Sequence, residues 1–143
     1  MSVIFSKKCE YALQAILYLA SIEKGENVSA RDISESLRIP KEFISKILQS
    51  LVHVKIVGSK KGKDGGFYLA KSPSKIRLID IVEAIDGSEI FTTCVLGFPK
   101  CLSISPCPVH NEWSKIREMA YIMLSAKTID KFKDNLIEKI KSI

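Results

Sequence analysis

The sequence has little of what an enzyme active site or a membrane anchor requires. It contains two histidines among 143 residues, and it lacks a glycine-rich phosphate loop and any nucleophile–base pattern. The apolar stretch over residues 11–22 is too short to span a membrane, and no convincing signal-cleavage site follows it. These absences argue against an enzyme, a membrane protein and an exported protein, and they predict a cytoplasmic location.

The excess positive charge of the chain lies entirely in its first half. Residues 1–75 contain thirteen Lys and Arg against seven Asp and Glu, whereas residues 76–143 contain nine of each. Lys and Arg that neutralise phosphates supply most of the sequence-independent affinity of a protein for DNA. A basic first half is therefore typical of a nucleic-acid-binding module, although a solvated basic surface gives the same composition.

Two short helices joined by a tight turn are predicted after a first helix over residues 7–22. Ser29 is a suitable N-cap for the first of the pair. Pro40 suits the first position of the second, over residues 40–53, because its missing N–H would have no helical partner there. The apolar stripe of this second helix comprises Phe43, Ile44, Ile47, Leu48 and Leu51. In a helix-turn-helix the second helix enters the major groove, so we expect DNA contacts from Pro40, Lys41, Glu42, Ser45, Lys46 and Gln49.

A β-hairpin is predicted directly after the helix pair. Residues 56–59 and 67–70 are typical strands, and a glycine-rich turn joins them. Three lysines, Lys60, Lys61 and Lys63, lie around this turn; turn chemistry does not require them, and they suit contact with phosphates or a minor groove. A basic hairpin after a helix-turn-helix is a wing. We therefore predict a mainly α-helical, winged helix-turn-helix DNA-binding domain over residues 1–87.

Further helices are predicted after the wing. One covers residues 78–86, a long one covers residues 109–126, and a last one begins after Thr128 as its N-cap. The apolar stripe of the long helix comprises Trp113, Ile116, Ala120, Met123 and Leu124. A small winged domain cannot bury this surface alone, so we expect residues 111–143 to form a dimerisation region. A homodimer would match the twofold symmetry of a palindromic operator.

Three of the four cysteines lie in a loop over residues 88–110 that prolines and a glycine keep irregular. Their spacing is Cys94-x6-Cys101-x5-Cys107, and His110 follows after two residues. Thiolates bind zinc or iron–sulfur clusters, and these gaps are wider than the ligand pairs of most structural zinc sites. The spacing alone is compatible with an iron–sulfur cluster, a zinc site, a reversible disulfide and unligated thiols.

Taken together, these motifs resemble the Rrf2 family of winged-helix regulators. The resemblance covers nearly the whole chain and rests on Glu10-Tyr11-Ala12-Leu13, residues 39–57, residues 62–69, residues 80–82, the three-cysteine loop and His110-x2-Trp113. It implies a homodimeric regulator that binds double-stranded DNA and senses iron–sulfur status, redox state or nitric oxide. It also implies that Cys94, Cys101 and Cys107 hold a cluster, with 2Fe–2S favoured over 4Fe–4S.

The fourth ligand of the cluster varies within the family. In the biogenesis regulators it is a histidine that matches His110. In some nitric-oxide and redox sensors it is a carboxylate from the first helix of the partner subunit, and Glu10 matches that position. We favour His110. Relatives without the cysteines control sulfur metabolism with a partner enzyme, and the intact cysteine triad argues against that branch.

The sequence departs from the family pattern in two places. The wing has Lys61-Gly62-Lys63-Asp64-Gly65 where relatives usually have Arg-Gly-Pro-Gly-Gly, and lysine cannot make the bidentate contacts of arginine. Ser45 stands where the biogenesis regulator has an acidic residue, so its promoter sequence does not carry over. The alternative functions are the same DNA-binding regulator with a zinc or thiol switch and, more remotely, an iron–sulfur carrier or electron-transfer protein.

Overall fold

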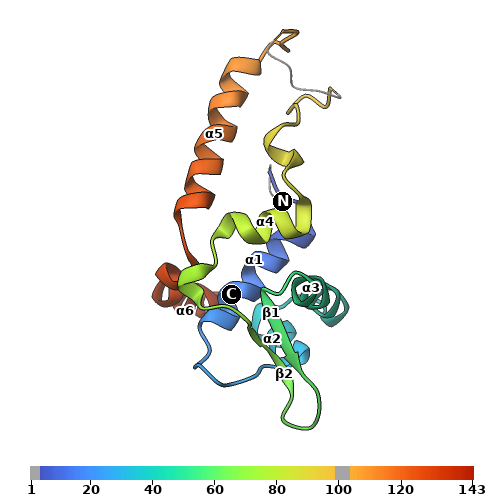
Figure 1. Ribbon diagram of the computed structural model, residues 1–143, viewed down its shortest axis with the longest axis vertical. Coiled ribbons are helices and arrows are strands. Elements are labelled where there is room, and N and C mark those ends of the chain that lie inside the picture. Colours follow the sequence, from blue (N-terminus) through green and yellow to red (C-terminus); the bar gives the residue numbers. More distant parts are fainter. Residues whose placement is uncertain (1–3, 99–103) are drawn as a thin grey trace.

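The computed structural model describes residues 4–98 and 104–143, which form a mainly helical fold with one two-stranded antiparallel hairpin. Figure 1 shows the helices α1 to α4 and the hairpin in one body, from which the long helix α5 extends. This arrangement confirms the predicted winged helix-turn-helix fold. None of the helices in the described ranges combines the length and apolar character that crossing a bilayer requires.

The helix-turn-helix consists of α2 (Ala30–Leu37) and α3 (Lys41–His53), packed on α1 (Lys7–Ala20). The Ser29 side chain caps α2 by accepting a hydrogen bond from the backbone N–H of Asp32, as the sequence predicts. Arg38 then adopts a left-handed conformation with φ of 56°, and the N–H of Ile39 bonds the carbonyl of Ser34. Pro40 is the N-cap of α3 and not its first helical residue, a difference of one position.

The wing consists of β1 (Val57–Lys60) and β2 (Gly66–Leu69), each shifted by one residue from its predicted bounds. Val28, in the α1–α2 connection, adds a short third edge because its N–H and carbonyl both bond Phe67, at 2.9 and 2.7 Å. Gly66 makes this approach possible. Its φ of 151° favours glycine, and a Cβ there would lie 2.8 Å from the carbonyl oxygen of Val28.

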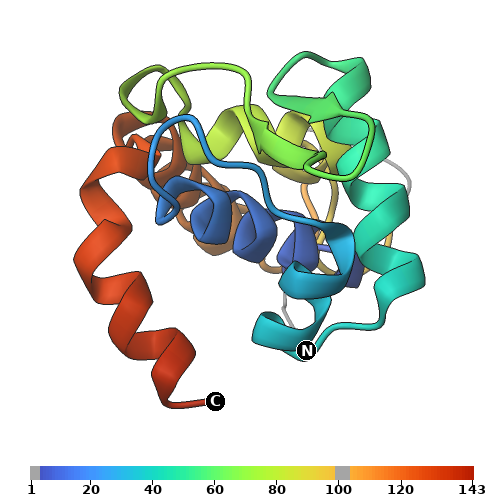
Figure 2. The same cartoon turned by 90° about the horizontal axis from the view of Figure 1, so that it is seen from below.

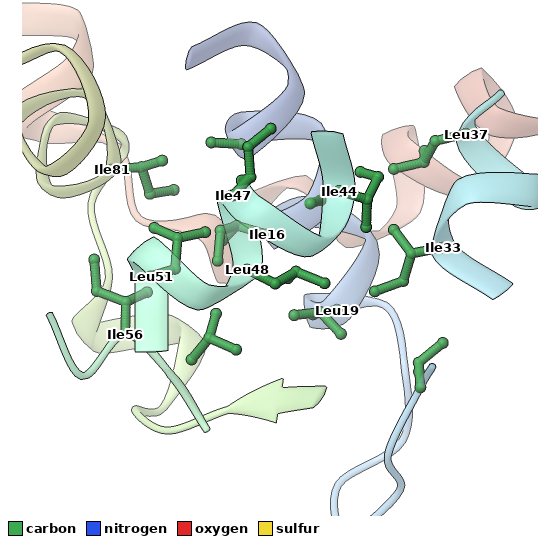
Figure 3. Packing of buried hydrophobic residues seen from close by; sticks show 14 of the residues in the cluster. Ile16, Leu19, Ile33, Leu37, Ile44, Ile47, Leu48, Leu51, Ile56 and Ile81 are labelled. Atoms are coloured by element: carbon green, nitrogen blue, oxygen red, sulfur yellow. The ribbon is translucent and has the colours of Figure 1, made fainter. Parts of the chain in front are cut away.

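The main core forms where α1, α2, α3 and the start of the wing meet. Figure 3 shows Ile16 of α1, Ile33 of α2 and Leu48 of α3 among the buried side chains of this cluster, and all three are fully buried. Four of the five apolar side chains predicted to face inward from α3 do so. Phe43 does not: 52% of its side chain is exposed, and its ring lies edge-on to Tyr11.

After the wing, the turn η1 (Pro73–Lys75) leads to α4 (Leu78–Asp86), and the turn η2 (Glu89–Phe91) opens the cysteine-bearing segment. The chain then continues through α5 (His110–Ala126), η3 (Ile129–Phe132) and α6 (Lys133–Lys141). Figure 2 shows α6 and α3 on opposite sides of α1. Of the stripe predicted on the long helix, only Leu124 is buried, in a second apolar cluster with Cys9, Ile79 and Val82.

Candidate functional site

The outward side of α3 is the surface on which the sequence places DNA contacts. Four of its predicted contact residues, Lys41, Glu42, Lys46 and Gln49, are exposed, and Ser45 is half-buried. Pro40, at the start of the helix, is exposed as well. Because the opposite side of α3 carries Ile44, Ile47, Leu48 and Leu51 into the core, packing fixes which side of the helix remains available to a nucleic acid.

The structure brings α3 and the wing together around a hollow of about 300 Å³. Gln49 of α3 and two of the predicted wing lysines, Lys60 and Lys61, line it together with Phe67. Lys63 is exposed in the turn of the wing and does not line this hollow. Three predicted contact residues from two separate elements therefore border one concave surface.

The wing tip is braced by a residue that the sequence analysis did not identify. The Asn27 side chain donates a hydrogen bond from Nδ2 to the backbone carbonyl of Asp64, at 3.2 Å. A second tie lies inside the turn, where the N–H of Gly65 bonds the carbonyl of Gly62. Asn27 joins the α1–α2 connection to the turn and so limits how far the wing lysines can move relative to the helices.

Two of the three loop cysteines lie side by side. The Sγ atoms of Cys94 and Cys107 are 3.7 Å apart, and neither forms a disulfide. A disulfide would require about 2.05 Å. Two thiolates on one tetrahedral metal with metal–sulfur bonds of about 2.3 Å would lie about 3.8 Å apart. The sulfur spacing therefore fits a shared metal ion or cluster iron, and it also fits a hydrogen-bonded thiol pair.

The other predicted ligands are not gathered around this pair in the described structure. Cys101 lies outside the described residues. Within residues 4–98 and 104–143, no three His, Cys, Asp or Glu side chains converge tightly enough to hold a metal ion. His110 opens α5, and its backbone N–H bonds the carbonyl of Cys107. Glu10 is half-buried on α1, with its carboxylate 3.3 Å from Nζ of Lys7.

The Cys94 sulfur has an environment that suits a thiolate. Burial raises the pKa of its thiol, but hydrogen bonds to the sulfur outweigh this effect and lower the pKa below its ordinary value. These bonds come first from the backbone N–H groups of Leu96 and Phe98, then from the Cys107 thiol and Gly97. Thiolates are the form that binds metals, and N–H groups directed at sulfur tune the potential of iron–sulfur clusters.

The segment that carries Cys94 is fastened to α5 by one face of that helix. Nε1 of Trp113 donates to the carbonyl of Thr93 at 3.0 Å, and Nη1 of Arg117 donates to the carbonyl of Phe91 at 2.7 Å. The Phe91 ring also meets Tyr121 edge-on, with centroids 5.2 Å apart. Figure 1 shows residues 88–98 running beside α5. We call these three contacts the loop clamp.

Trp113 was predicted as part of the apolar stripe of the long helix and as a family motif, whereas Arg117 and Tyr121 were not predicted as functional residues. Their spacing of four residues, at 113, 117 and 121, was the available signal, because side chains four apart share one face of a helix. Arg117 is the most constrained of the three. Its Nη2 bonds Ser114 at 3.3 Å, and its Nε is buried without a hydrogen-bond partner among the described residues.

Cys9, the one cysteine outside the loop, is a structural residue at the junction of α1 and α4. Its side chain is fully buried beside Leu124 of α5. Burial, together with the nearby Asp86 carboxylate, raises the pKa of its thiol to about 12. Asp86 also accepts a hydrogen bond from the backbone N–H of Ser6, the N-cap of α1. A thiol that stays protonated is a poor metal ligand.

Comparison with known proteins identifies the family. Residues 5–135 match the model of Rrf2, described as an iron-dependent transcriptional regulator. The chain belongs to the Rrf2 family. An HTH-type transcriptional regulator assigned in Aquifex aeolicus (strain VF5) is 34% identical over 129 residues, which cover 89% of each chain. This Rrf2 protein is therefore a DNA-binding transcriptional regulator and not an enzyme.

Solved structures share the fold of this chain. CymR (YrzC), the global cysteine regulator of B. subtilis, superposes with a TM-score of 0.78 at 20% identity, over 92% of this chain and 96% of CymR. IscR of T. potens superposes with a TM-score of 0.72 at 25% identity, over 91% of this chain and 86% of IscR. The winged fold is thus shared with both proteins.

Proposed function

We propose that this Rrf2 protein is a homodimeric regulator whose DNA binding responds to an iron–sulfur cluster held by Cys94, Cys101 and Cys107. The observation that carries the proposal is the Cys94–Cys107 pair, with 3.7 Å between its sulfur atoms and backbone N–H groups directed at Cys94. We expect His110 as the fourth ligand, with Glu10 of the partner subunit as the alternative. A 2Fe–2S cluster is favoured over 4Fe–4S.

In the DNA-binding part of the proposal, residues 1–87 of the two subunits bind a palindromic operator. Residues 40–49 enter the major groove. The side chains expected near bases and phosphates are Pro40, Lys41, Glu42, Ser45, Lys46 and Gln49. Lys60, Lys61 and Lys63 of the wing contact the adjacent backbone or minor groove. The support is that α3 and the wing border one concave surface, and that this half of the chain carries the whole positive excess.

The homodimer is supported by the apolar surface of α5, in the region 111–143. Ile116, Met119, Ile122 and Met123 are each about half or more exposed, at 50, 71, 58 and 47%. A run of large apolar side chains on one helix that extends from the body is costly to leave in water. Pairing of two copies along α5 would cover this surface and place two copies of α3 for a twofold DNA site.

Coupling between the loop, residues 88–110, and the DNA surface would run through contacts of this chain. The loop clamp holds residues 91–93 to α5, and Asp86 at the end of α4 holds Ser6 at the start of α1. When bound, a cluster supplies a charge and an oxidation state that change on oxidation or loss. A loop rearranged by that change would pull on Thr93 and Phe91, and therefore on α5 and the separation of the two α3 helices.

Purification without oxygen tests the cluster directly. Iron, zinc and acid-labile sulfide would be measured per chain, together with the visible spectrum, for the wild type, Cys101→Ala and Cys9→Ala. We expect matched iron and sulfide in the wild type and in Cys9→Ala, because Cys9 lies outside the loop. Cys101→Ala should lose both while remaining folded. A Cys101→Ala protein with full iron and sulfide would remove Cys101 from the site.

The fourth ligand is tested by two matched variants. His110→Ala should weaken retention of the cluster and change its spectrum, whereas Glu10→Gln should leave both unchanged. The reverse result would assign the cluster to a site shared between subunits. Because Glu10 pairs with Lys7 at 3.3 Å, a Lys7→Ala control would show whether loss of that ion pair alone has an effect.

The main alternative is the same DNA-binding regulator with a zinc or thiol switch in place of a cluster. The 3.7 Å spacing of the two sulfur atoms favours it as well, since it suits a zinc ion and a thiol pair close enough to oxidise after a small movement. Zinc without sulfide, or no metal after reconstitution, would select it. A cluster carrier without DNA binding, the more remote alternative from the sequence, does not agree with membership of this family of DNA-binding regulators.

A further inference from the structure

Phe43 is an exposed aromatic side chain on the first turn of α3. Its side chain is 52% exposed, whereas Ile44 and Leu48 of the same helix are fully buried. Single exposed apolar residues are common and need no explanation by themselves. Phe43 differs because its ring is held from the side, edge-on to the Tyr11 ring with centroids 6.0 Å apart. Nζ of Lys7 lies 5.2 Å from the centroid of that tyrosine ring.

The position of Phe43 on the helix places it beside the predicted DNA contacts. Residues three apart are neighbours on a helix surface, so Phe43 lies next to Lys46, which is exposed. The residues that line the hollow against the wing, Gln49 and Val52, lie on the other flank of the same outward side. Phe43 therefore borders the DNA-facing stripe on the flank away from the wing.

The charges around Phe43 indicate what its ring would meet. Two lysines of α3, Lys41 and Lys46, lie near Phe43, and Lys7 of α1 lies over the tyrosine ring that supports it. Two carboxylates oppose them, Glu42 on α3 and Glu10 on α1, which pairs with Lys7 at 3.3 Å. A surface with this balance attracts a polyanion more readily than an apolar protein face. In the major groove, the apolar group that base pairs present is the 5-methyl of thymine, and phenylalanine is one of the side chains that contact it.

We propose that Phe43, braced by Tyr11, reads a thymine 5-methyl group in the major groove and thereby sets a T·A preference at one position of each half-site. The inference rests on the placement of α3 in the groove and not on the cluster. The ring is fixed before DNA arrives, so little side-chain freedom is lost when the contact forms. Lys46, its neighbour on the helix, would meanwhile bind a phosphate or a base edge.

In vitro selection from a library of random duplexes tests the proposal with the full chain. Wild type, Phe43→Ala and Phe43→Leu would be selected in parallel, with Val54→Ala as a matched control, since Val54 is an exposed apolar residue just past the end of α3. We expect a symmetric motif with a fixed thymine for the wild type and for Val54→Ala. Phe43→Ala should lose the preference at that thymine alone.

Replacement of thymine by uracil then isolates the methyl group. Uracil at that position in both half-sites should weaken wild-type binding by about tenfold, since two buried methyl groups are lost. The same replacement should leave Phe43→Ala binding unchanged. Phe43→Leu keeps an apolar side chain and guards against a folding defect of the alanine variant, which circular dichroism and thermal unfolding would reveal.

Three results would overturn the proposal. Uracil could weaken the wild type and Phe43→Ala equally, or Phe43→Ala could select the wild-type motif unchanged. Phe43→Ala could also change the oligomeric state, measured as the mass in solution, without altering the selected motif. That result would make Phe43 a subunit contact. A wild type that selects no motif at all would count instead against the placement of α3 in the groove, and so against the DNA-binding model itself.

Discussion

The two parts of the molecule on either side of residue 88 differ in how they bury their apolar side chains. Of the 22 buried apolar side chains in the described ranges, 19 precede residue 88 and only Cys94, Leu124 and Ile129 follow it. Of the 14 large apolar side chains that are exposed in the same ranges, 11 follow residue 88. The first part, residues 4–87, supplies nearly all of the main core, to which the second part adds Ile129. The second part exposes the kind of surface that a folded chain normally covers.

The difference teaches where each part obtains its stability. Residues 4–87 are stabilised by burial within one chain, and this burial holds α3 and the wing in a fixed relation. The cysteine segment and α5 depend instead on a few directed contacts, namely the loop clamp and Leu124. A weakly buried segment that is held by few contacts is the kind of element that a bound group or a second copy of the chain can reorganise.

The largest expected effect comes from the core of the first part. Leu48→Ala should lower the free energy of unfolding by about 2–5 kcal/mol, because it leaves a cavity where a fully buried side chain stood. Ile104→Ala, at a side chain that is 89% exposed in the second part, should change it by less than about 0.5 kcal/mol. Chemical denaturation measures both. Equal losses would mean that the two parts do not differ in burial.

The second largest effect should be on dimerisation through α5. Met119→Glu introduces a charge on the apolar surface of α5. It should weaken the dimer by roughly 10- to 100-fold, since the carboxylate would be desolvated in the dimer interface. Lys115→Glu, an exposed charge change on the same helix, is the matched control. Analytical ultracentrifugation over a dilution series gives the dissociation constant. If the Met119→Glu dimer were as tight as the wild-type dimer, the dimer interface would lie elsewhere.

Most elements of the first part were predicted from the sequence because their signals are local. Ser29 caps α2 and Pro40 precedes α3, as short-range patterns indicate. Phe43 was placed inward because an apolar stripe does not mark its own edge, and the Tyr11 ring that supports Phe43 comes from another helix. The strands of the wing were predicted to within one residue, because the residues of the predicted turn are seven consecutive positions, residues 60–66.

The second part was less predictable because its decisive contacts are long-range. Thr128 was expected to begin the last helix, but a 3-10 turn, Ile129–Phe132, comes first. The N–H of Ile129 bonds the carbonyl of Ile76, and the N–H of Leu78 bonds that of Lys127, so a contact across about fifty residues decides the local conformation. The cysteine spacing pointed to a loop site. No local pattern could show that Arg117 holds that loop at Phe91.

A third, smaller effect concerns the loop clamp. Arg117→Ala removes the bond to the Phe91 carbonyl and should raise the rate of amide hydrogen exchange over residues 88–98 by roughly tenfold, equivalent to about 1.4 kcal/mol of local stability. Exchange in α3 should not change, because its core is independent of α5. Arg31→Ala, which breaks an exposed ion pair on α2, serves as the control. Unchanged exchange at residues 88–98 would leave Trp113 and Tyr121 as the whole clamp.

The wing should show a smaller effect still, on DNA affinity and not on folding. Lys61→Ala should reduce the slope of log affinity against log salt by about 1 and weaken binding to all sequences alike, as expected for the loss of one phosphate contact. Lys71→Ala, an exposed lysine beyond β2, is a control of equal charge. Fluorescence anisotropy at several salt concentrations measures both slopes. A slope that Lys61→Ala leaves unchanged would remove this lysine from the interface.

The smallest effect lies at Cys9, which joins the two parts of the molecule through its contact with Leu124. Burial raises the pKa of its thiol from the ordinary 9.0 to about 12, so the folded state keeps a proton that the unfolded state releases. The stability that depends on this proton is fully present below pH 9 and is lost as the pH rises from about 9 towards 12. Cys9→Ala has no thiol to titrate, so its melting temperature should decline less steeply between pH 8 and pH 10.5 than that of the wild type. Tyrosines and lysines titrate in both proteins and cancel in the comparison. Parallel declines would show that the thiol is not held protonated at this junction, and that Leu124 packs against a site open to water.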